Sequence, residues 1–245
     1  MDPITGNLIF PMQSYVVRTG HHIILVDTCV GNHKDRPGRD NWHQTTGTQY
    51  MDGLAALGLS VEDIDYVMCT HMHTDHVGWN TKLLDGRWVP TFPNAKYVFS
   101  EKEYDYWEDL NKRTPLPHLI DSVLPIVEAG RAMMVSNDFA LDDKVWLAPT
   151  PGHTPDHFSI RLSSNGFDGV MSGDLMHCPV QCRHPEWVAR PDYKPEQAIE
   201  TRRAFMETYC ETDVLVCTAH FPLPSAGHFV RHGDVFDFEY DTVDW

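Results

Sequence analysis

Four potential metal ligands lie within six consecutive residues of the segment CTHMHTDHVGWN, residues 69–80: His71, His73, Asp75 and His76. Imidazole nitrogens and carboxylate oxygens are ligands that zinc prefers, and a zinc site needs three or four of them around one point. His71 and His73 are two residues apart, so both rings can reach one ion from a turning loop. Asp75 and His76 are adjacent, so their side chains diverge. Dividing the four ligands between two neighbouring ions is therefore easier than crowding them around one.

Three more candidate ligands follow expected strands or stand in tight turns: His153 in TPGHTPDH, Asp174 in GVMSGDLMH and His220 in VLVCTAHFP. Ligands at the ends of several strands meet at one edge of a sheet, where α/β folds place their sites. Seven ligands suit two ions that share one carboxylate, and Asp174 is suited to that bridge. A lone histidine at a strand end is usually solvated or hydrogen-bonded. His153 and His220 are therefore candidate ligands mainly because the first motif already predicts a metal site.

The elements that must position these ligands alternate between short apolar strands and helical segments. The alternation of apolar residues and turn signals predicts two strands within residues 14–27, turning at Thr19-Gly20. Further strands are predicted at residues 64–70, 96–99, 144–148, 158–162, 169–172 and 214–218. Capping and helical spacing predict helices at residues 48–57, from 100 to about 110, at 118–129 with a break at Pro125, and at 195–209. Residues 27–43 form a long polar loop. Mixed strands and helices without a linker predict one α/β domain over residues 1–245.

The composition excludes several classes of partner. The formal net charge is −16, with 19 Lys and Arg against 35 Asp and Glu, which disfavours nucleic acid and anionic membranes as partners. No apolar run is long enough to span a membrane, and residues 1–10 lack the basic and apolar blocks of a signal peptide. We therefore expect a cytoplasmic protein with a small-molecule substrate, which can form a homodimer. The six cysteines are scattered, apart from Cys178 and Cys182, and fit free thiols in a reducing compartment.

The stretches THMHTDHVGWN, PTPGHTPDH, SGDLMH and TAHFPLPSAGHF resemble, in this order, the motifs of the metallo-β-lactamase superfamily. The resemblance runs from about Tyr15 to the C-terminus. It implies an αββα sandwich (metallo-β-lactamase fold) with a dinuclear metal site at one edge of the sheets. By this resemblance, one ion is held by His71, His73 and His153, the second is held by Asp75, His76 and His220, and Asp174 bridges the two. Asp27, in LVDT, matches an aspartate that orients the ligands from behind.

Within the superfamily, HVGWN, GDLMH and HFPLPSAGHF look most similar to the methyl-parathion-hydrolase-like group, which has the acyl-homoserine-lactone lactonases as well-known relatives. Members usually carry more chain before the position of Tyr15. The resemblance implies two divalent metal ions as cofactors. Zinc is the expected metal, and manganese, iron or cobalt also suit His and Asp ligands.

Two such ions hold a hydroxide between them at neutral pH, and this hydroxide attacks an electrophilic carbon or phosphorus. The expected activity is therefore hydrolysis of an ester, lactone or phosphotriester. Asp174, as the bridge, and Asp75, which can orient the hydroxide or carry a proton, are the candidate catalytic residues.

Substrate selection is expected from residues beside the ligands. Four apolar residues are pocket candidates, with core packing an equally good interpretation of each: Met72, Trp79, Leu175 and Phe221. His177 and His228 are candidate hydrogen-bond donors to the substrate. His157, four residues after His153, favours a structural role because a strand follows it directly.

Other functions remain as alternatives. A β-lactamase fits less well because Asp174 matches the bridging carboxylate of the general hydrolases, and a glyoxalase-II-like thioesterase is a further possibility. The acidic composition disfavours a nuclease. A flavodiiron-type oxygen reductase is disfavoured, because such a protein is expected to carry a carboxylate near the position of His73 and an attached flavin domain. A non-catalytic, metal-stabilised binding module would need few open coordination positions, whereas seven ligands for two ions leave room for water and substrate.

Overall fold

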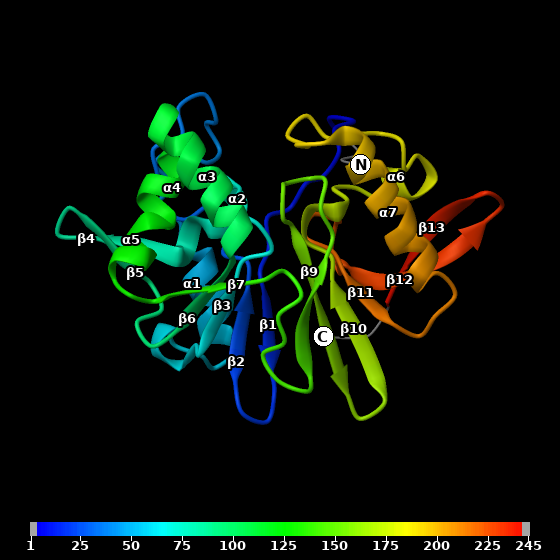
Figure 1. Cartoon of the computed structure of the whole chain (residues 1–245), viewed down its shortest axis with the longest axis horizontal. Helices are drawn as coiled ribbons and strands as arrows, with labels where there is room; N and C mark the ends of the chain where they lie inside the picture. Colours follow the sequence, from blue (N-terminus) through cyan, green and yellow to red (C-terminus); the bar gives the residue numbers. More distant parts are fainter. Residues whose placement is uncertain (1–3, 242–245) are drawn as a thin grey trace. The chain divides into compact units, whose positions relative to one another are not determined.

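The computed structural model describes residues 4–241 and divides the chain into two compact units. The N-terminal unit is Gln13–Val135. The C-terminal unit is Ser136–Trp245 together with Met1–Met12, and the structure describes residues 4–12 and 136–241 of it. Each unit combines a β-sheet with helices, as the mixed α/β pattern predicts (Figure 1). The single domain over residues 1–245 stays a prediction.

A five-stranded sheet forms the N-terminal unit, in the order β1-β2-β3-β6-β7. Its strands are β1 (Tyr15–Arg18), β2 (Ile23–Val26), β3 (Tyr66–Met68), β6 (Lys96–Ser100) and β7 (Ala132–Val135). β2, β3, β6 and β7 are parallel, while β1 pairs with β2 in the antiparallel sense. Parallel neighbours direct their carboxyl ends to the same sheet edge, so the loops after β2 and β3 start side by side.

The helices between these strands include α1 (Gln49–Ala56), α3 (Glu101–Arg113), α4 (Pro117–Ser122) and α5 (Leu124–Glu128). Their apolar residues Leu54, Leu119 and Ile126 pack on Val67 and Phe99 of the sheet. All five side chains are almost fully buried. Burial of a large aliphatic or aromatic side chain stabilises a fold by about 1.5–3 kcal/mol, so this cluster anchors the strands that carry the ligand loop.

The helix starts follow local sequence signals. The Ser100 side chain accepts a hydrogen bond from the backbone N–H of Glu103 at 3.2 Å, which caps α3 as predicted. The Glu103 carboxylate accepts a hydrogen bond from Trp107 Nε1 at 2.7 Å, within the same helix. Pro125 separates α4 from α5, because its ring cannot continue the preceding helix. The break predicted at Pro125 within residues 118–129 is therefore confirmed, and the segment forms two short helices.

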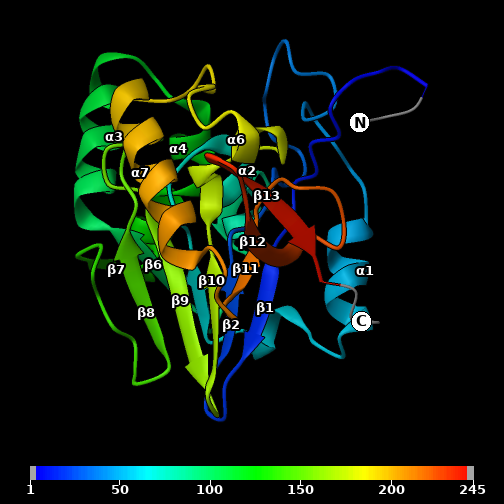
Figure 2. The ribbon, with the colours of Figure 1, turned by 90° about the vertical axis from the view of Figure 1, so that its right-hand side faces the viewer.

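The C-terminal unit contains a six-stranded sheet in the order β13-β12-β11-β10-β9-β8. The strands are β8 (Val145–Pro149), β9 (Phe158–Ser164), β10 (Phe167–Met171), β11 (Leu215–Cys217), β12 (Ala226–His232) and β13 (Val235–Tyr240). Helices α6 (Val180–Arg183) and α7 (Pro195–Tyr209) accompany it, and α7 lies along the sheet (Figures 1 and 2). Phe205 and Met206 of α7 pack with Val216 and Phe229 in a second core.

Two hairpins are absent from the sequence-based prediction. The first joins β4 (Thr81–Leu84) and β5 (Arg87–Pro90) through Asp85-Gly86, both at positive φ. The second joins β12 and β13 through Gly233, also at positive φ. Asp-Gly between apolar stretches is a strong hairpin signal, so the first hairpin could have been predicted.

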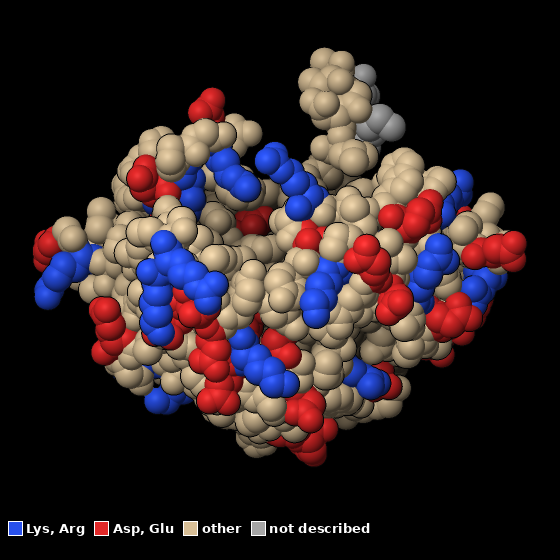
Figure 3. Space-filling model, turned by 45° about the horizontal axis from the view of Figure 1, so that its top comes forward, with Lys and Arg blue, Asp and Glu red and all other residues tan. Residues whose placement is uncertain are grey.

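Among residues 4–241, no helix is long and apolar enough to cross a membrane. The face drawn in Figure 3 carries basic and acidic side chains interspersed rather than gathered by sign. All six cysteines are free thiols, as expected from their spacing.

Candidate metal centre

The histidine-rich loop of the N-terminal unit starts directly after β3 and leads into the short helix α2 (Thr74–Val77). His71 and His73 lie before the helix, with Nε2 of His71 3.1 Å from Nδ1 of His73. Asp75 and His76 lie within the helix, and Asp75 Oδ2 is 4.0 Å from His76 Nε2. The first pair lies in the loop and the second in the helix. The expected divergence of the Asp75 and His76 side chains is wrong, because their ligating atoms lie only 4.0 Å apart.

Asp27, the residue after β2, holds this loop from behind. Its Oδ1 accepts a hydrogen bond from the backbone N–H of Thr70 at 2.8 Å, and its Oδ2 lies 2.8 Å from Nδ1 of His76. Asp27 has a φ of 55°, a left-handed conformation that aspartate tolerates better than most residues. Because Nδ1 faces the carboxylate, the opposite nitrogen, Nε2, is the one presented for ligation.

Gly78, next to the ligands, permits a close approach between two loops. Its N–H donates to Cys29 O at 2.8 Å, and Thr28 N–H donates to His76 O at the same distance. A Cβ at Gly78 would lie 2.0 Å from the carbonyl carbon of Val30. The loop after β2 and the histidine-rich loop after β3 therefore hold each other in place through their backbones.

In the C-terminal unit, three histidines surround the carboxylate of Asp174, which follows β10 in a short 3-10 helix, Gly173–Leu175. Oδ1 lies 2.9 Å from Nε2 of His220, and Oδ2 lies 3.3 Å from Nε2 of both His153 and His177. The exposed fraction of each of the four side chains is 10% or less. This set includes all three ligands that the sequence predicts in this part of the chain.

The imidazoles of His153 and His220 are held from their other side. His153 Nδ1 lies 2.7 Å from Asp192 Oδ1, and His220 Nδ1 donates to the Pro11 carbonyl at 2.8 Å. Phe10 stacks on His220 with ring centroids 3.9 Å apart. These contacts turn both Nε2 atoms towards Asp174.

His157 has a structural role, consistent with the sequence-based interpretation. Its Nε2 accepts the backbone N–H of Asp174 at 3.0 Å, and its Nδ1 lies 2.8 Å from Thr150 Oγ1. Both ring nitrogens are thereby engaged, and the residue fixes the Asp174 turn.

The pKa values of two histidines beside Asp174 are shifted in opposite directions. Burial opposes protonation of His153, but the carboxylates of Asp174 and Asp192 prevail and raise its pKa to about 9. Burial lowers the pKa of His177, against the attraction of Asp174. Because a metal ligand must be deprotonated, an ion at His153 has to displace a proton there.

The donor chemistry of both sets fits divalent metal ions. Around the Asp174 carboxylate, the rings of His153 and His220 are oriented by a carboxylate and a carbonyl behind them, which is the arrangement that metal-binding histidines typically adopt. In the other unit, Asp27 orients His76 in the same manner. Histidine and aspartate side chains together suit zinc and neighbouring transition metals.

The other predicted site residues lie elsewhere in the two units. Met72 belongs to the core of the N-terminal unit, and Leu175 and Phe221 belong to that of the C-terminal unit, which fits the core-packing interpretation. Trp79 is 9% exposed and stacks on Tyr50 at 5.3 Å.

His177 joins the Asp174 group, whereas His228 does not. The His228 ring contacts the Val214 carbonyl through Nδ1 at 3.0 Å. It lines a pocket of about 860 Å³ with Phe167, Asp168 and Asp213.

Three supporting residues were not predicted from the sequence: Phe10, Pro11 and Asp192. The Pro11 carbonyl and His220 are 209 residues apart in the chain, and Asp192 and His153 are 39 apart. No local spacing signals such contacts. The one available hint was that Asp192 is an acidic residue in a Pro-rich loop.

A model of the metallo-β-lactamase superfamily matches residues 10–220. An N-acyl homoserine lactonase of Bacillus cereus is 26% identical over 175 residues, which cover 65% of this chain and 61% of the lactonase. A β-lactamase-like protein 2 homolog of Caenorhabditis elegans is 27% identical over 169 residues, covering 67% of this chain and 44% of that protein. The chain thus spans about three fifths of the length of the curated lactonases that it matches.

Two solved structures are similar to this chain over most of its length. The hydrolase AbOPH of the β-lactamase superfamily has a TM-score of 0.81 and 25% identity, with 96% of this chain and 81% of that chain covered. AidC, a dizinc quorum-quenching lactonase with a bound product, has a TM-score of 0.76 and 24% identity at the same coverage, which shows a shared fold. The family model matches most of the chain, the fold is similar to that of a hydrolase of the superfamily, and the histidine and aspartate motifs are present. The chain therefore belongs to the metallo-β-lactamase superfamily.

Proposed function

We propose that this protein is a metal-dependent hydrolase that opens the ester bond of a small neutral lactone or ester. The observation that carries the proposal is the group of buried imidazoles whose Nε2 atoms lie within 3.3 Å of the Asp174 carboxylate. Family membership and the N-acyl homoserine lactonases among the relatives support lactones as the substrate class.

The proposed ligand set follows the resemblance of the chain's motifs to those of the superfamily. His71, His73 and His153 bind one ion, Asp75, His76 and His220 bind the second, and Asp174 bridges them. This division is supported by the two oxygens of Asp174, which face different histidines. Zinc is the proposed metal because of the donor types and the dizinc lactonase among the similar structures.

When bound, two such ions supply a hydroxide nucleophile at neutral pH and polarise the substrate carbonyl. The chain's own residues provide the geometry. Asp27 and the Pro11 carbonyl orient the imidazoles of His76 and His220. Asp75, with its side chain 11% exposed, is the proposed group that orients the attacking water and moves its proton. The net charge of −16 favours an uncharged substrate over an anionic one.

The test is metal analysis of the purified protein, followed by assays with an N-acyl homoserine lactone, an aryl ester, a phosphotriester and a cephalosporin. We expect two metal ions per chain and hydrolysis of the lactone above the other substrates. His153→Ala and His220→Ala should lose metal and activity, while His228→Ala, a control outside the Asp174 group, should keep both. Fewer than two ions per chain, with no hydrolysis after reloading with zinc, would overturn the proposal. Faster cleavage of the phosphotriester or cephalosporin would reject the substrate class alone.

A further inference from the structure

A fully buried arginine lies behind the Asp174 group without belonging to it. Arg202, on α7, has an exposed fraction of 0%. Its Nε donates to the Leu175 carbonyl at 2.9 Å, and its Nη1 donates to the carbonyls of Pro185 and Trp187 at 2.7 and 3.0 Å. Burial of a guanidinium is costly unless hydrogen bonds and an opposite charge compensate it.

The opposite charge is Asp192, whose Oδ2 lies 3.9 Å from Nη2 of Arg202. The same carboxylate accepts the Ala189 N–H through Oδ2 at 2.8 Å and faces His153 Nδ1 through Oδ1 at 2.7 Å. The adjacent residue, Tyr193, donates its backbone N–H to the His153 carbonyl at 3.0 Å. These contacts hold Asp192 in position beside the His153 imidazole.

Arg202 therefore joins two segments that carry proposed ligands. Its bond to Leu175 holds the turn of Asp174, and its bonds to Pro185 and Trp187 hold the loop that carries Asp192. A change in either segment would move His153 and Asp174 relative to each other.

We propose that Asp192 and Arg202 are positioning residues for metal binding: Asp192 holds the Nδ1–H of His153 so that Nε2 is the ligand, and Arg202 fixes Asp192 and the Asp174 turn together. The inference rests on the proposed role of His153 and Asp174 as ligands. Carboxylates that hold a metal-binding imidazole in this way typically contribute roughly 10–100-fold to metal affinity.

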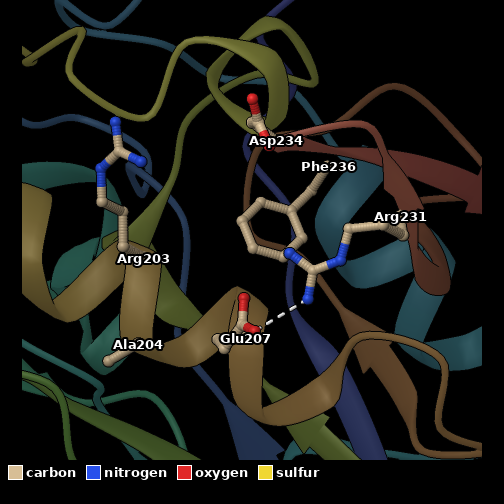
Figure 4. A pocket seen from close by; sticks show the side chains of 6 residues that line it. All are labelled: Arg203, Ala204, Glu207, Arg231, Asp234 and Phe236. Carbon is tan, nitrogen blue, oxygen red and sulfur yellow. Dashed lines mark hydrogen bonds and ion pairs between the residues drawn. The ribbon is translucent and has the colours of Figure 1, made fainter.

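The same helix offers a matched control. Arg203, next in sequence, has a side chain 50% exposed and forms a surface ion pair with the exposed Glu186 at 3.6 Å. It lines a separate pocket of about 340 Å³ with Glu207, Arg231 and Phe236 (Figure 4). Arg203→Met removes a guanidinium from α7 without touching the Asp192 contacts.

The experiment measures zinc affinity by competition with a chelator, and the His153 Nδ1 proton by NMR of the zinc-loaded protein. We expect Asp192→Ala to lower zinc affinity roughly 10–100-fold and to abolish the downfield proton that marks a carboxylate-bound imidazole. Asp192→Asn, whose amide oxygen can still accept, should retain part of both. Arg202→Lys should lower the affinity less than Arg202→Met, and Arg203→Met should match the unaltered protein.

Unchanged zinc affinity and an unchanged His153 proton in Asp192→Ala would overturn the inference while leaving the proposed hydrolase intact. If Asp192→Ala does not fold, the same comparison in Asp192→Asn and Arg202→Lys decides. If the unaltered protein binds no zinc, the inference and the proposed function fail together.

Discussion

Asp27 Oδ2 lies 2.8 Å from Nδ1 of His76, across 49 residues of the chain. Both side chains are almost fully buried, and Asp27 also accepts the Thr70 N–H, so one carboxylate fixes both the start of the ligand loop and the orientation of a ligand. The parallel pairing of β2 with β3 makes this contact possible, because it starts both loops at the same sheet edge.

We expect Asp27→Asn to weaken the binding of one of the two proposed ions roughly 10–100-fold, because the orientation and basicity of His76 change. Metal content after dialysis against a chelator series measures the effect. Asp65→Asn is the control, since Asp65 also accepts a backbone N–H from the neighbouring strand, at Ile23, on the exposed surface. Equal metal retention by both variants would contradict the role of Asp27.

Gly78→Ala should destabilise the fold by about 1–3 kcal/mol, because the added Cβ would lie 2.0 Å from the Val30 carbonyl carbon. Gly53→Ala, inside α1, has no atom within 4 Å of its new Cβ and should stabilise the protein by about 0.5–1 kcal/mol. Urea unfolding of both variants measures the difference. A Gly78→Ala protein as stable as the unaltered one would show that the two loops are not braced by their backbones.

Phe10→Ala should lower zinc affinity by roughly 2- to 10-fold, since a stacked aromatic pair contributes about 0.5–1.5 kcal/mol. The ring lies 3.9 Å from that of His220 and is 39% exposed, so the free energy of unfolding should change little. Leu8→Ala, on the same segment and 57% exposed, is the control for zinc competition measurements. The role of Phe10 is excluded if both variants bind zinc alike.

The buried thiols should be unreactive near neutral pH. Burial raises the pKa of Cys182 and of Cys217 to about 12. The thiolate is the reactive form, and a raised pKa makes it scarcer at pH 8 than in an ordinary thiol, so reactivity should rise only as the pH approaches that value. Reaction with an aromatic disulfide, followed by mass spectrometry, measures this in native and urea-unfolded protein. Fast labelling of Cys182 in the native state at pH 8 would contradict the burial of this thiol.

The sequence predicted the parts of the structure that depend on local spacing. The helix over residues 195–209 coincides with α7, and the strand pair over residues 14–27 contains β1 and β2. Pro at the first turn of α7 and the Thr19-Gly20 turn are short-range signals that tertiary packing did not override.

Contacts between distant segments could not be predicted in this way. Asp192 and Arg202 follow no ligand spacing, and an arginine on an amphipathic helix is normally expected in solvent. Phe10 and Pro11 lie in a segment without regular structure, yet they hold His220. Their roles depend on which segments meet in three dimensions, which periodicity does not encode.

The most direct test of the proposed function is the hydrolysis of N-hexanoyl-homoserine lactone by metal-free and zinc-reloaded protein, followed by acid release at constant pH. We predict no hydrolysis without metal and full recovery when two zinc ions per chain are restored. Hydrolysis at an undiminished rate by the metal-free protein, or none by protein carrying two zinc ions, would contradict the claim that this chain is a metal-dependent lactone hydrolase.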